Sequence, residues 1–241
     1  MPARKTLARM SHSCNSESMF VCTFLNNKGG VGKSTAAVEK ASYLNELGSS
    51  VLVIDADSSE DCAKHLQAAT TDIPVRKWTN AHEIRDGMAN LPSGCDFVVA
   101  DSPSNCHAEA VALLEHSDVV LIPTEPSLKS IVGSLATYDL AQEVRKRTGD
   151  KPTQVYIFFN KVDMRRKKKN REWRSVLEER NIPMLNSYLR KKIKVFEDAE
   201  ELETTVGRMK HTRDTLEAQT DLAAVFGEVL QNILKQKVAN G

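Results

Sequence analysis

Residues 28–35 read Lys-Gly-Gly-Val-Gly-Lys-Ser-Thr and follow directly on an apolar run at 19–25. In this setting the glycines let backbone N–H groups turn inward around a chain of phosphates. Lys33 supplies a positive charge to the β- and γ-phosphates, and the Ser34 hydroxyl can ligate Mg²⁺. The helix that follows points the positive end of its dipole at the same anion. The stretch therefore predicts a strand, a phosphate loop and a helix that together bind a nucleoside triphosphate.

The start of this loop departs from the general pattern. Asn27 stands where a glycine is usual, and an extra lysine, Lys28, follows it. This variant resembles the deviant Walker A motif of the ParA/MinD superfamily of ATPases, in which the first lysine reaches across a dimer interface to the partner's nucleotide. The resemblance implies that Lys28 acts in trans on ATP and Lys33 in cis. It also implies that the nucleotide is bound by Lys28, Gly29, Gly30, Val31, Gly32, Lys33, Ser34 and Thr35, together with Asn160 further along the chain.

Several short apolar runs along the chain are of the kind buried in a parallel sheet. We expect strands at about 19–26, 51–54, 97–100, 119–122 and 155–159, and helices at about 33–47, 60–68, 107–115, 129–147, 170–180 and 212–236. Polar residues follow these strands at the edge where open α/β sheets bind ligands. The pattern predicts an α/β fold of the P-loop NTPase kind, with a twisted, mainly parallel sheet and helices on both faces.

Carboxylates stand at the ends of two of the predicted strands. Asp101 is placed like a Walker B aspartate, which holds Mg²⁺ directly or through a water. Asp55 and Asp57 resemble the Asp-x-Asp of the ParA/MinD family, although Ser58-Ser59 replaces the usual Pro-Gln. The resemblance implies that Asp57 activates the attacking water. It implies that Ser34, Asp55 and Asp101 serve the Mg²⁺ ion and that the catalytic residues are Lys28, Lys33 and Asp57. Aspartates at strand ends also cap helices, and this structural role stays open for Asp55.

The motif Asn160-Lys161-Val162-Asp163 matches the guanine-reading NKxD of GTPases. In that motif the aspartate accepts hydrogen bonds from guanine N1 and the exocyclic amine, which adenine cannot supply. ParA-type proteins also place an asparagine at this strand end to read adenine. GTPases usually show Asp-x-x-Gly after the Walker B strand, whereas this chain has Asp101-Ser102-Pro103-Ser104. Together with Lys28, this favours ATP over GTP.

The resemblance extends along most of the chain. Residues 119–127 look like the family's strand followed by a Pro-rich loop near the nucleotide. Residues 182–190 look like a late strand that ends in a basic loop, and residues 196–199 stand where the family has a helix. We therefore expect a further strand at 182–190.

Length and composition agree with one cytoplasmic domain. The chain has 241 residues, 41% of them hydrophobic and 27% charged, and can bury a large core. Residues 1–18 are polar and Ser-rich, so we expect a disordered arm there and a single domain at 19–241. The five cysteines lack paired or zinc-binding spacing, which favours a reducing compartment. No apolar run approaches the ~18 residues of a membrane span.

Basic residues are concentrated late in the chain. Residues 145–194 hold 17 Lys and Arg against 5 Asp and Glu. Such a concentration is typical of a polyanion site, and few aromatic residues are interleaved, so phosphate contact without base reading is expected. The candidate DNA-binding residues are Arg165, Arg166, Lys167, Lys168, Lys169, Arg190, Lys191, Lys192 and Lys194. A solvated helix face is the alternative for this run.

By resemblance, the chain is an ATPase that dimerises with ATP and Mg²⁺, binds nonspecific double-stranded DNA and moves a plasmid or other cargo when a ParB-like or other adaptor stimulates hydrolysis. It would then be associated with the nucleoid. Two alternatives stay open. One is a VirC-like accessory switch in conjugation. The other is a MinD-like membrane-positioning ATPase, for which the apolar stripe in the helix at 212–236 would have to contact lipid.

Overall fold

The computed structural model describes residues 19–149, 151–152 and 154–239, so the arm expected at 1–18 lies outside the described residues. Every strand and helix expected from periodicity is present, within a few residues of its predicted bounds. The strands are β1 (Phe20–Phe24), β2 (Val51–Asp55), β3 (Val75–Lys77), β4 (Phe97–Asp101), β5 (Val119–Thr124) and β6 (Gln154–Phe159). The α-helices are α2 (Lys33–Glu46), α3 (Asp61–Ala68), α4 (Ala81–Ala89), α5 (His107–His116), α6 (Leu128–Thr148), α7 (Lys167–Glu178), α8 (Ile193–Glu201) and α9 (Arg213–Ala239). Two short 3₁₀ turns are η1 (Met164–Arg166) and η2 (Val206–Arg208).

The strands form one sheet of six, in the order β3-β2-β4-β1-β5-β6, and every neighbouring pair runs parallel. Asp55 lies opposite Asp101, and Asp101 lies opposite Phe24 in the central strand β1. Because parallel strands all end at the same edge, this register places both aspartates beside the loop that follows β1. The predicted α/β fold is confirmed, and the sheet is wholly parallel.

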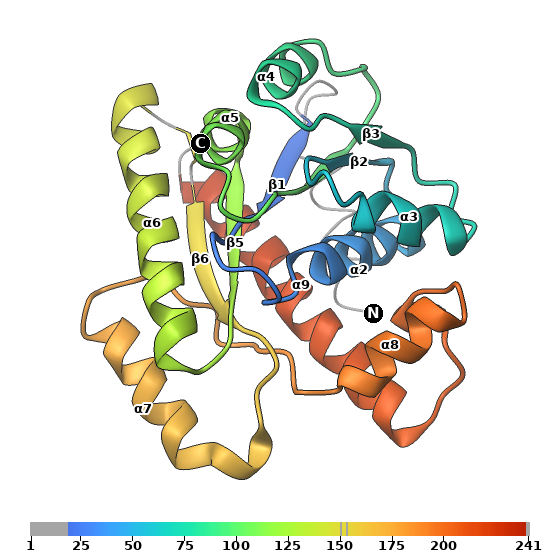
Figure 1. The fold of residues 1–241 in the computed structure, drawn as a ribbon, viewed down its shortest axis with the longest axis vertical. Coiled ribbons are helices and arrows are strands. Elements are labelled where there is room, and N and C mark those ends of the chain that lie inside the picture. Colours follow the sequence, from blue (N-terminus) through green and yellow to red (C-terminus); the bar gives the residue numbers. More distant parts are fainter. Residues whose placement is uncertain (1–18, 150, 153, 240–241) are drawn as a thin grey trace.

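Helices cover both faces of the sheet (Figure 1). Successive residues of a strand point to opposite faces. Val51 and Val53 therefore join a cluster with α2, α8 and α9, whereas Leu52 and Ile54 join one with α4 and α5. Over β5 and β6, a third cluster contains residues of α5, α6 and α7. Burial on both faces is why these strands read as continuous apolar runs.

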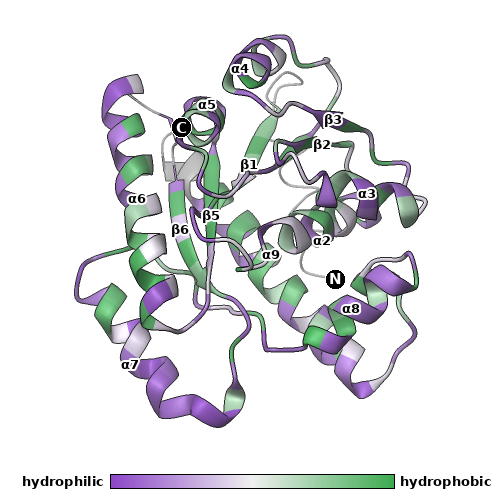
Figure 2. Cartoon of the chain, in the orientation of Figure 1, coloured by the Kyte–Doolittle hydropathy of each residue, from purple (hydrophilic) through white to green (hydrophobic). Residues whose placement is uncertain are grey.

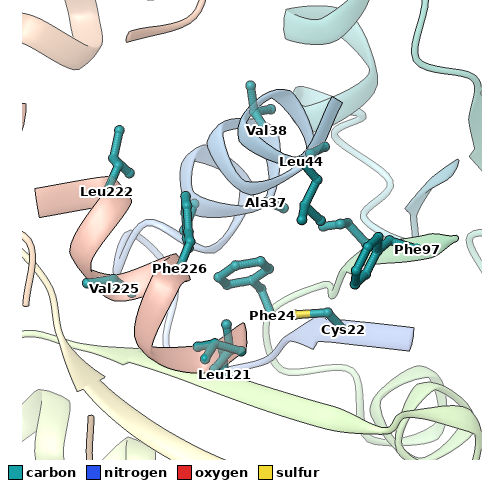
Figure 3. Close-up of a cluster of buried hydrophobic side chains, with 14 of the residues drawn as sticks. Cys22, Phe24, Ala37, Val38, Leu44, Phe97, Leu121, Leu222, Val225 and Phe226 are labelled. Atoms are coloured by element: carbon teal, nitrogen blue, oxygen red, sulfur yellow. The ribbon is translucent and has the colours of Figure 1, made fainter. Parts of the chain in front are cut away.

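The largest cluster lies directly behind the phosphate loop. Phe24 of β1 packs there with Ala37 of α2 and with Val225 and Phe226 of α9 (Figure 3). The apolar stripe of α9, which a membrane-binding protein would have to expose, is thus buried against the sheet and α2. None of the helices in the described part of the chain is long and apolar enough to cross a bilayer.

The strand expected at 182–190 is wrong. This segment runs beside β6 but makes only isolated bridges, from Met184 to Ile157 and from Arg190 to Val162. Between these bridges the backbone N–H groups of Asn186 and Ser187 both donate to the Glu228 carboxylate of α9, each at 2.8 Å. A side chain on α9 therefore takes the hydrogen bonds that a continuous ladder would need.

Candidate nucleotide site

The phosphate loop connects the end of β1 to the start of α2. Gly30 and Gly32 have φ angles of 73° and 87°, in the left-handed region where side chains are strained. Gly32 is the N-cap of α2, and no side chain among the described residues caps the first N–H groups of that helix. Those groups and the loop backbone are therefore available to an anion at the positive end of the helix dipole.

A buried asparagine in front of the loop fixes its shape. The Asn26 amide nitrogen donates to the Pro123 carbonyl at 2.8 Å and to the Ser134 hydroxyl at 3.0 Å. Its side-chain oxygen accepts the N–H of Lys28 at 2.9 Å. The loop is thus tied to the neighbouring strand β5 and to helix α6. Sequence reasoning missed Asn26, although a polar residue that ends an apolar strand just before a glycine-rich loop was a usable signal.

Lys33 points into the interior of the site. Its ammonium nitrogen donates to the Ser104 hydroxyl at 2.6 Å, and only 6% of the residue is exposed. Burial lowers the pKa of Lys33, while the nearby Asp101 and Asp57 carboxylates act in the opposite direction. Ser104 lies just beyond β4 and was not among the predicted site residues. A phosphate group would offer this buried ammonium a charged acceptor in place of a neutral hydroxyl.

Asp101 is fully buried, and neither of its carboxylate oxygens has a hydrogen-bond partner among the described residues. Burial raises its pKa to about 7, and the nearby Ser34 hydroxyl and Lys33 ammonium oppose this rise. A buried carboxylate without partners is costly unless a cation or proton satisfies it. The described residues include no group of three or more His, Cys, Asp or Glu side chains that could hold a metal. Asp101 and Ser34 nevertheless fit Mg²⁺, which takes few protein ligands and completes its shell with waters and phosphates.

Asp55 is also fully buried, but its oxygens are occupied. They accept the N–H of Ala63 at 2.8 Å and the N–H of Asp57 at 3.1 Å. Burial raises the pKa of Asp55, and these two backbone hydrogen bonds lower it. Asp55 therefore fixes the loop after β2 and the first turn of α3, the structural role that its position at a strand end had left open.

Asp57 stands two residues further along the same loop and is half-buried. One of its oxygens accepts the N–H of Ser59 at 3.0 Å. Both Asp57 and Asp101 influence the pKa of Lys33, so the three charges lie within electrostatic reach of one another. The structure thus brings Lys33, Ser34, Asp57 and Asp101 to one place at the carboxyl edge of the sheet.

Asn160 and Lys161 brace the phosphate loop from the end of β6. The Asn160 amide donates to the Val31 carbonyl at 2.8 Å, and the Lys161 ammonium donates to the Gly30 carbonyl at 2.6 Å. A Cβ atom at Gly32 would lie 2.4 Å from the Asn160 amide nitrogen, so a side chain there would collide with this contact. Asn160 therefore supports the loop whether or not it also reads a base.

A cavity of about 400 Å³ opens beside the loop. Gly32, Thr35, Asn160 and Lys161 line it on the loop side. The opposite wall is formed by the 189–200 segment, which contributes apolar side chains such as Leu189 and Phe196. A cavity with apolar walls next to a phosphate-binding loop suits the base and ribose of a nucleotide.

The chain was compared with known proteins. Residues 22–206 match the family model described as the CobQ/CobB/MinD/ParA nucleotide binding domain. The chain belongs to this family. It thus carries a nucleotide-binding ATPase domain of the ParA/MinD type, and the resemblance inferred from the phosphate loop is confirmed at the family level.

Relatives of this ParA/MinD-family protein include the maintenance of carboxysome distribution protein A of Gloeobacter kilaueensis. The two are 29% identical over 176 residues, which is 70% of this chain and 76% of the relative. An ATP complex of Cyanothece McdA has a TM-score of 0.69 and 14% identity, over 87% of this chain and 97% of that one. A plasmid partition protein from Borrelia burgdorferi B31 bound to AMPPNP has a TM-score of 0.66 and 14% identity, over 91% and 100%. At these identities the solved structures establish the fold.

The basic residues of this ParA/MinD-family chain fall into two groups. Residues 165–169 are all exposed, at the end of η1 and in the first turn of α7, where the ribbon of Figure 2 is coloured as hydrophilic. Arg190 instead pairs with Asp221 at 2.8 Å and with Glu217 at 3.0 Å. Lys192 pairs with Glu217 at 2.8 Å and with Asp214 at 2.6 Å. Lys191 and Lys194 are exposed. The structure therefore separates an open basic surface at 166–169 from cations that are neutralised, Arg165 by Asp163 and Arg190 and Lys192 by α9.

Proposed function

We propose that residues 19–241 form one ParA-type ATPase domain that closes into an ATP-bound sandwich homodimer, binds DNA without sequence preference and drives segregation or positioning of a plasmid or other cargo. The observation that carries the proposal is the buried carboxylate of Asp101, which lies beside Ser34, Lys33 and the phosphate loop and has no close hydrogen-bond partner among the described residues. A magnesium–nucleotide complex would supply a cation for the Asp101 carboxylate and phosphate oxygens for the Lys33 ammonium. The carboxysome-distribution and plasmid-partition relatives support a positioning role.

The chemistry follows from which groups face the phosphates. The N–H groups at the start of α2 and Lys33 bind the phosphate oxygens, and Ser34 with Asp101 would hold Mg²⁺. When bound, the ion neutralises charge on the phosphates as the terminal phosphoryl group leaves. Asp57, half-buried near Lys33, is the side chain that would orient and deprotonate the attacking water. Asp55 shapes the loop that carries Asp57, and any service to the ion would come through water.

Lys28 supplies the link between nucleotide and dimer. Its side chain is 24% exposed and lies 3.9 Å from the Glu125 carboxylate at the rim of the loop. Its backbone packs against α6, where a Cβ at Gly133 would lie 3.5 Å from the Lys28 Cβ. The Lys28 ammonium is engaged with Glu125, whereas that of Lys33 is buried beside Ser104. Lys28 is placed to reach a nucleotide held by a second copy.

The DNA contact is assigned to the exposed start of α7. Arg166, Lys167, Lys168 and Lys169 offer cations without a surrounding set of aromatic side chains, which suits phosphate contact rather than base reading, whereas Arg165 is paired with Asp163. Lys191 and Lys194 extend the candidate surface. Arg190 and Lys192 instead form ion pairs with carboxylates of α9. An adaptor of the ParB kind would then stimulate hydrolysis and release the protein from DNA.

Analytical ultracentrifugation tests the nucleotide switch. The purified chain with Mg²⁺ is run with ATP, with ADP and without nucleotide, and ATP hydrolysis is followed in parallel. A dimer only with ATP, together with slow turnover, supports the proposal. Lys28→Ala is the matched variant, because it should bind ATP as a monomer and fail to dimerise. A wild-type chain that binds ATP and stays monomeric at all concentrations would exclude the sandwich dimer.

A further inference from the structure

The loop side of the nucleotide cavity is built from two consecutive residues that grip the phosphate loop. Asn160 holds the Val31 carbonyl and Lys161 holds the Gly30 carbonyl. The N–H of Lys161 also donates to the Asn160 side-chain oxygen at 2.8 Å, which fixes the orientation of the amide. Lys161 has a φ of 55°, so the chain turns sharply here. This turn carries the next residues along the mouth of the cavity.

Asp163 follows this turn closely. Val162 is paired with the 189–191 segment that forms the opposite wall, through hydrogen bonds of 3.0 Å from its N–H to the Leu189 carbonyl and from the Lys191 N–H to its own carbonyl. Asp163 therefore directly follows the point at which the two walls of the cavity are hydrogen-bonded to each other. A carboxylate at this point has the chemistry to read guanine, because it accepts hydrogen bonds from N1–H and the 2-amino group. Adenine offers neither donor on that edge.

In this structure the Asp163 carboxylate is occupied elsewhere. It receives a forked contact from Arg165, with the Nε donating to one oxygen at 3.0 Å and the Nη2 donating to the other at 2.8 Å. The backbone N–H of Arg165 donates to it as well, at 3.0 Å. These hydrogen bonds lower the pKa of Asp163 to about 2. Asp163 is not among the residues that line the cavity, whereas Asn160 and Lys161 are.

We infer that Asp163 is a guanine-reading carboxylate that Arg165 holds away from the nucleotide, so that one ion pair sets the preference of this site for ATP over GTP. The inference rests on the proposed function, because it requires a nucleoside triphosphate on the phosphate loop. The far wall offers apolar side chains, Leu189 and Phe196, which would contact either purine alike, and also the carboxylates of Glu197 and Glu200. The part of the discrimination assigned to the Asn160–Asp163 motif then depends on whether the Asp163 oxygens are free.

The expected effect is moderate, because the pair is open to water. The Arg165 side chain is 87% exposed, and exposed ion pairs hold their partners weakly. Removal of Arg165 should therefore raise GTP affinity by about three- to fivefold and leave ATP affinity unchanged.

Binding of ATP, GTP and XTP to the full chain is measured by calorimetry with Mg²⁺ and without DNA. The variants are Arg165→Ala, the double variant Arg165→Ala/Asp163→Asn, and Arg180→Ala as an exposed arginine elsewhere on the surface. Asparagine keeps the oxygen that caps η1, so the turn is preserved. Xanthine carries a carbonyl where guanine has its 2-amino group, so the double variant should lose the gain for GTP and gain affinity for XTP. A merely structural role for Asp163 does not predict this exchange.

The outcomes separate the inference from the proposed function. A wild-type chain that binds ATP, combined with an unchanged ATP to GTP ratio in Arg165→Ala, overturns the inference and leaves the ATPase proposal standing. Equal affinity of the wild type for ATP and GTP also overturns it, because there is then no preference for ATP that the Arg165–Asp163 pair could set. A chain that binds no nucleoside triphosphate overturns both.

Discussion

Lys28 and Glu125 form an ion pair within one chain, with 3.9 Å between the ammonium nitrogen and a carboxylate oxygen. The other oxygen of Glu125 lies 3.5 Å from Lys161, which also grips the phosphate loop. If Lys28 acts on the nucleotide of a second copy, this contact must break as the dimer closes.

Glu125→Gln should therefore strengthen ATP-dependent dimerisation. The pair is partly exposed, so we expect the dimer dissociation constant to fall by about threefold. Sedimentation equilibrium with Mg²⁺ and a slowly hydrolysed ATP analogue measures the constant. Glu178→Gln, which breaks an exposed pair with Arg174 on α7, is the control and should change nothing. A weaker dimer in Glu125→Gln would show that Glu125 supports closure.

Lys33→Ala should abolish nucleotide binding. Lys33 is the buried cation of the phosphate loop, and Asp101 would then face the phosphates without a compensating charge. We expect ATP affinity to fall by at least two orders of magnitude, on the order of 3 kcal/mol for a buried charged contact. Calorimetry with ATP and Mg²⁺ checks this, with circular dichroism as the test of folding. Normal affinity in a folded variant would remove the assignment of the loop.

Asp57→Ala should trap the ATP-bound dimer. Its carboxylate has one backbone partner, Ser59, so its loss disturbs the loop less than loss of Asp55, which holds two. ATP should still bind and the dimer should persist, while turnover falls about 10²-fold or more, as for removal of a general base. Rapid hydrolysis by this variant would contradict the role of Asp57.

The ion-free protein should lose stability as pH rises from about 4 to 7. The pKa of Asp101 is raised by burial from 3.8 to about 7, and that of Glu39 is raised by burial from 4.5 to about 7. In this window the folded state binds more protons than the unfolded chain, so the free energy of unfolding falls as pH rises. Above pH 7 neither group contributes further to this fall.

Urea unfolding at pH 5.0, 6.0 and 7.5 measures the slope. Asp101→Asn should flatten it by about 1–3 kcal/mol across the window, the cost of a buried group without partners. Mg²⁺ with ATP should reverse the loss, since both supply partners for Asp101 and Lys33. An identical slope in wild type and Asp101→Asn would mean that Asp101 is not the titrating group.

The central strands could be predicted from the sequence because they are buried on both faces. Each reads as an unbroken apolar run, and its polar terminal residue marks the carboxyl edge of the sheet. Thus the sequence predicts Lys33, Ser34 and Asp101 at one edge of the sheet without knowledge of the strand order. The family could also be predicted, since Lys28 distinguishes this phosphate loop from the general pattern.

Elements without that signal were missed. β3 is a three-residue edge strand whose side chains are largely exposed. Its sequence therefore contains no apolar run from which a strand could be predicted. α4 contains Gly87, a residue with low helix propensity. The glycine is required because a Cβ there would lie 2.3 Å from the Trp78 ring. The 182–190 segment failed as a strand through Glu228, a partner distant in sequence.

The same limit applies to side-chain partners. Asp163 ends a motif whose letters match the guanine-reading NKxD, and the letters do not show its fork with Arg165, two residues further on. The pairing of Arg190 and Lys192 with α9 could not be read from a run of basic letters either, because their acidic partners lie more than twenty residues away. Charge counts predict a basic segment, and only the fold shows which cations remain free.

The most direct test of the account is binding of the purified chain to random-sequence duplex DNA with ATP, ADP or no nucleotide, across a series of salt concentrations. The matched variant replaces Lys167, Lys168 and Lys169 by glutamine, which leaves the ion-paired Arg190 and Lys192 in place. We expect binding only with ATP, a steep fall with salt, and a shallower salt dependence in the variant. Binding that ignores the nucleotide, or no binding in any state, would contradict this expectation.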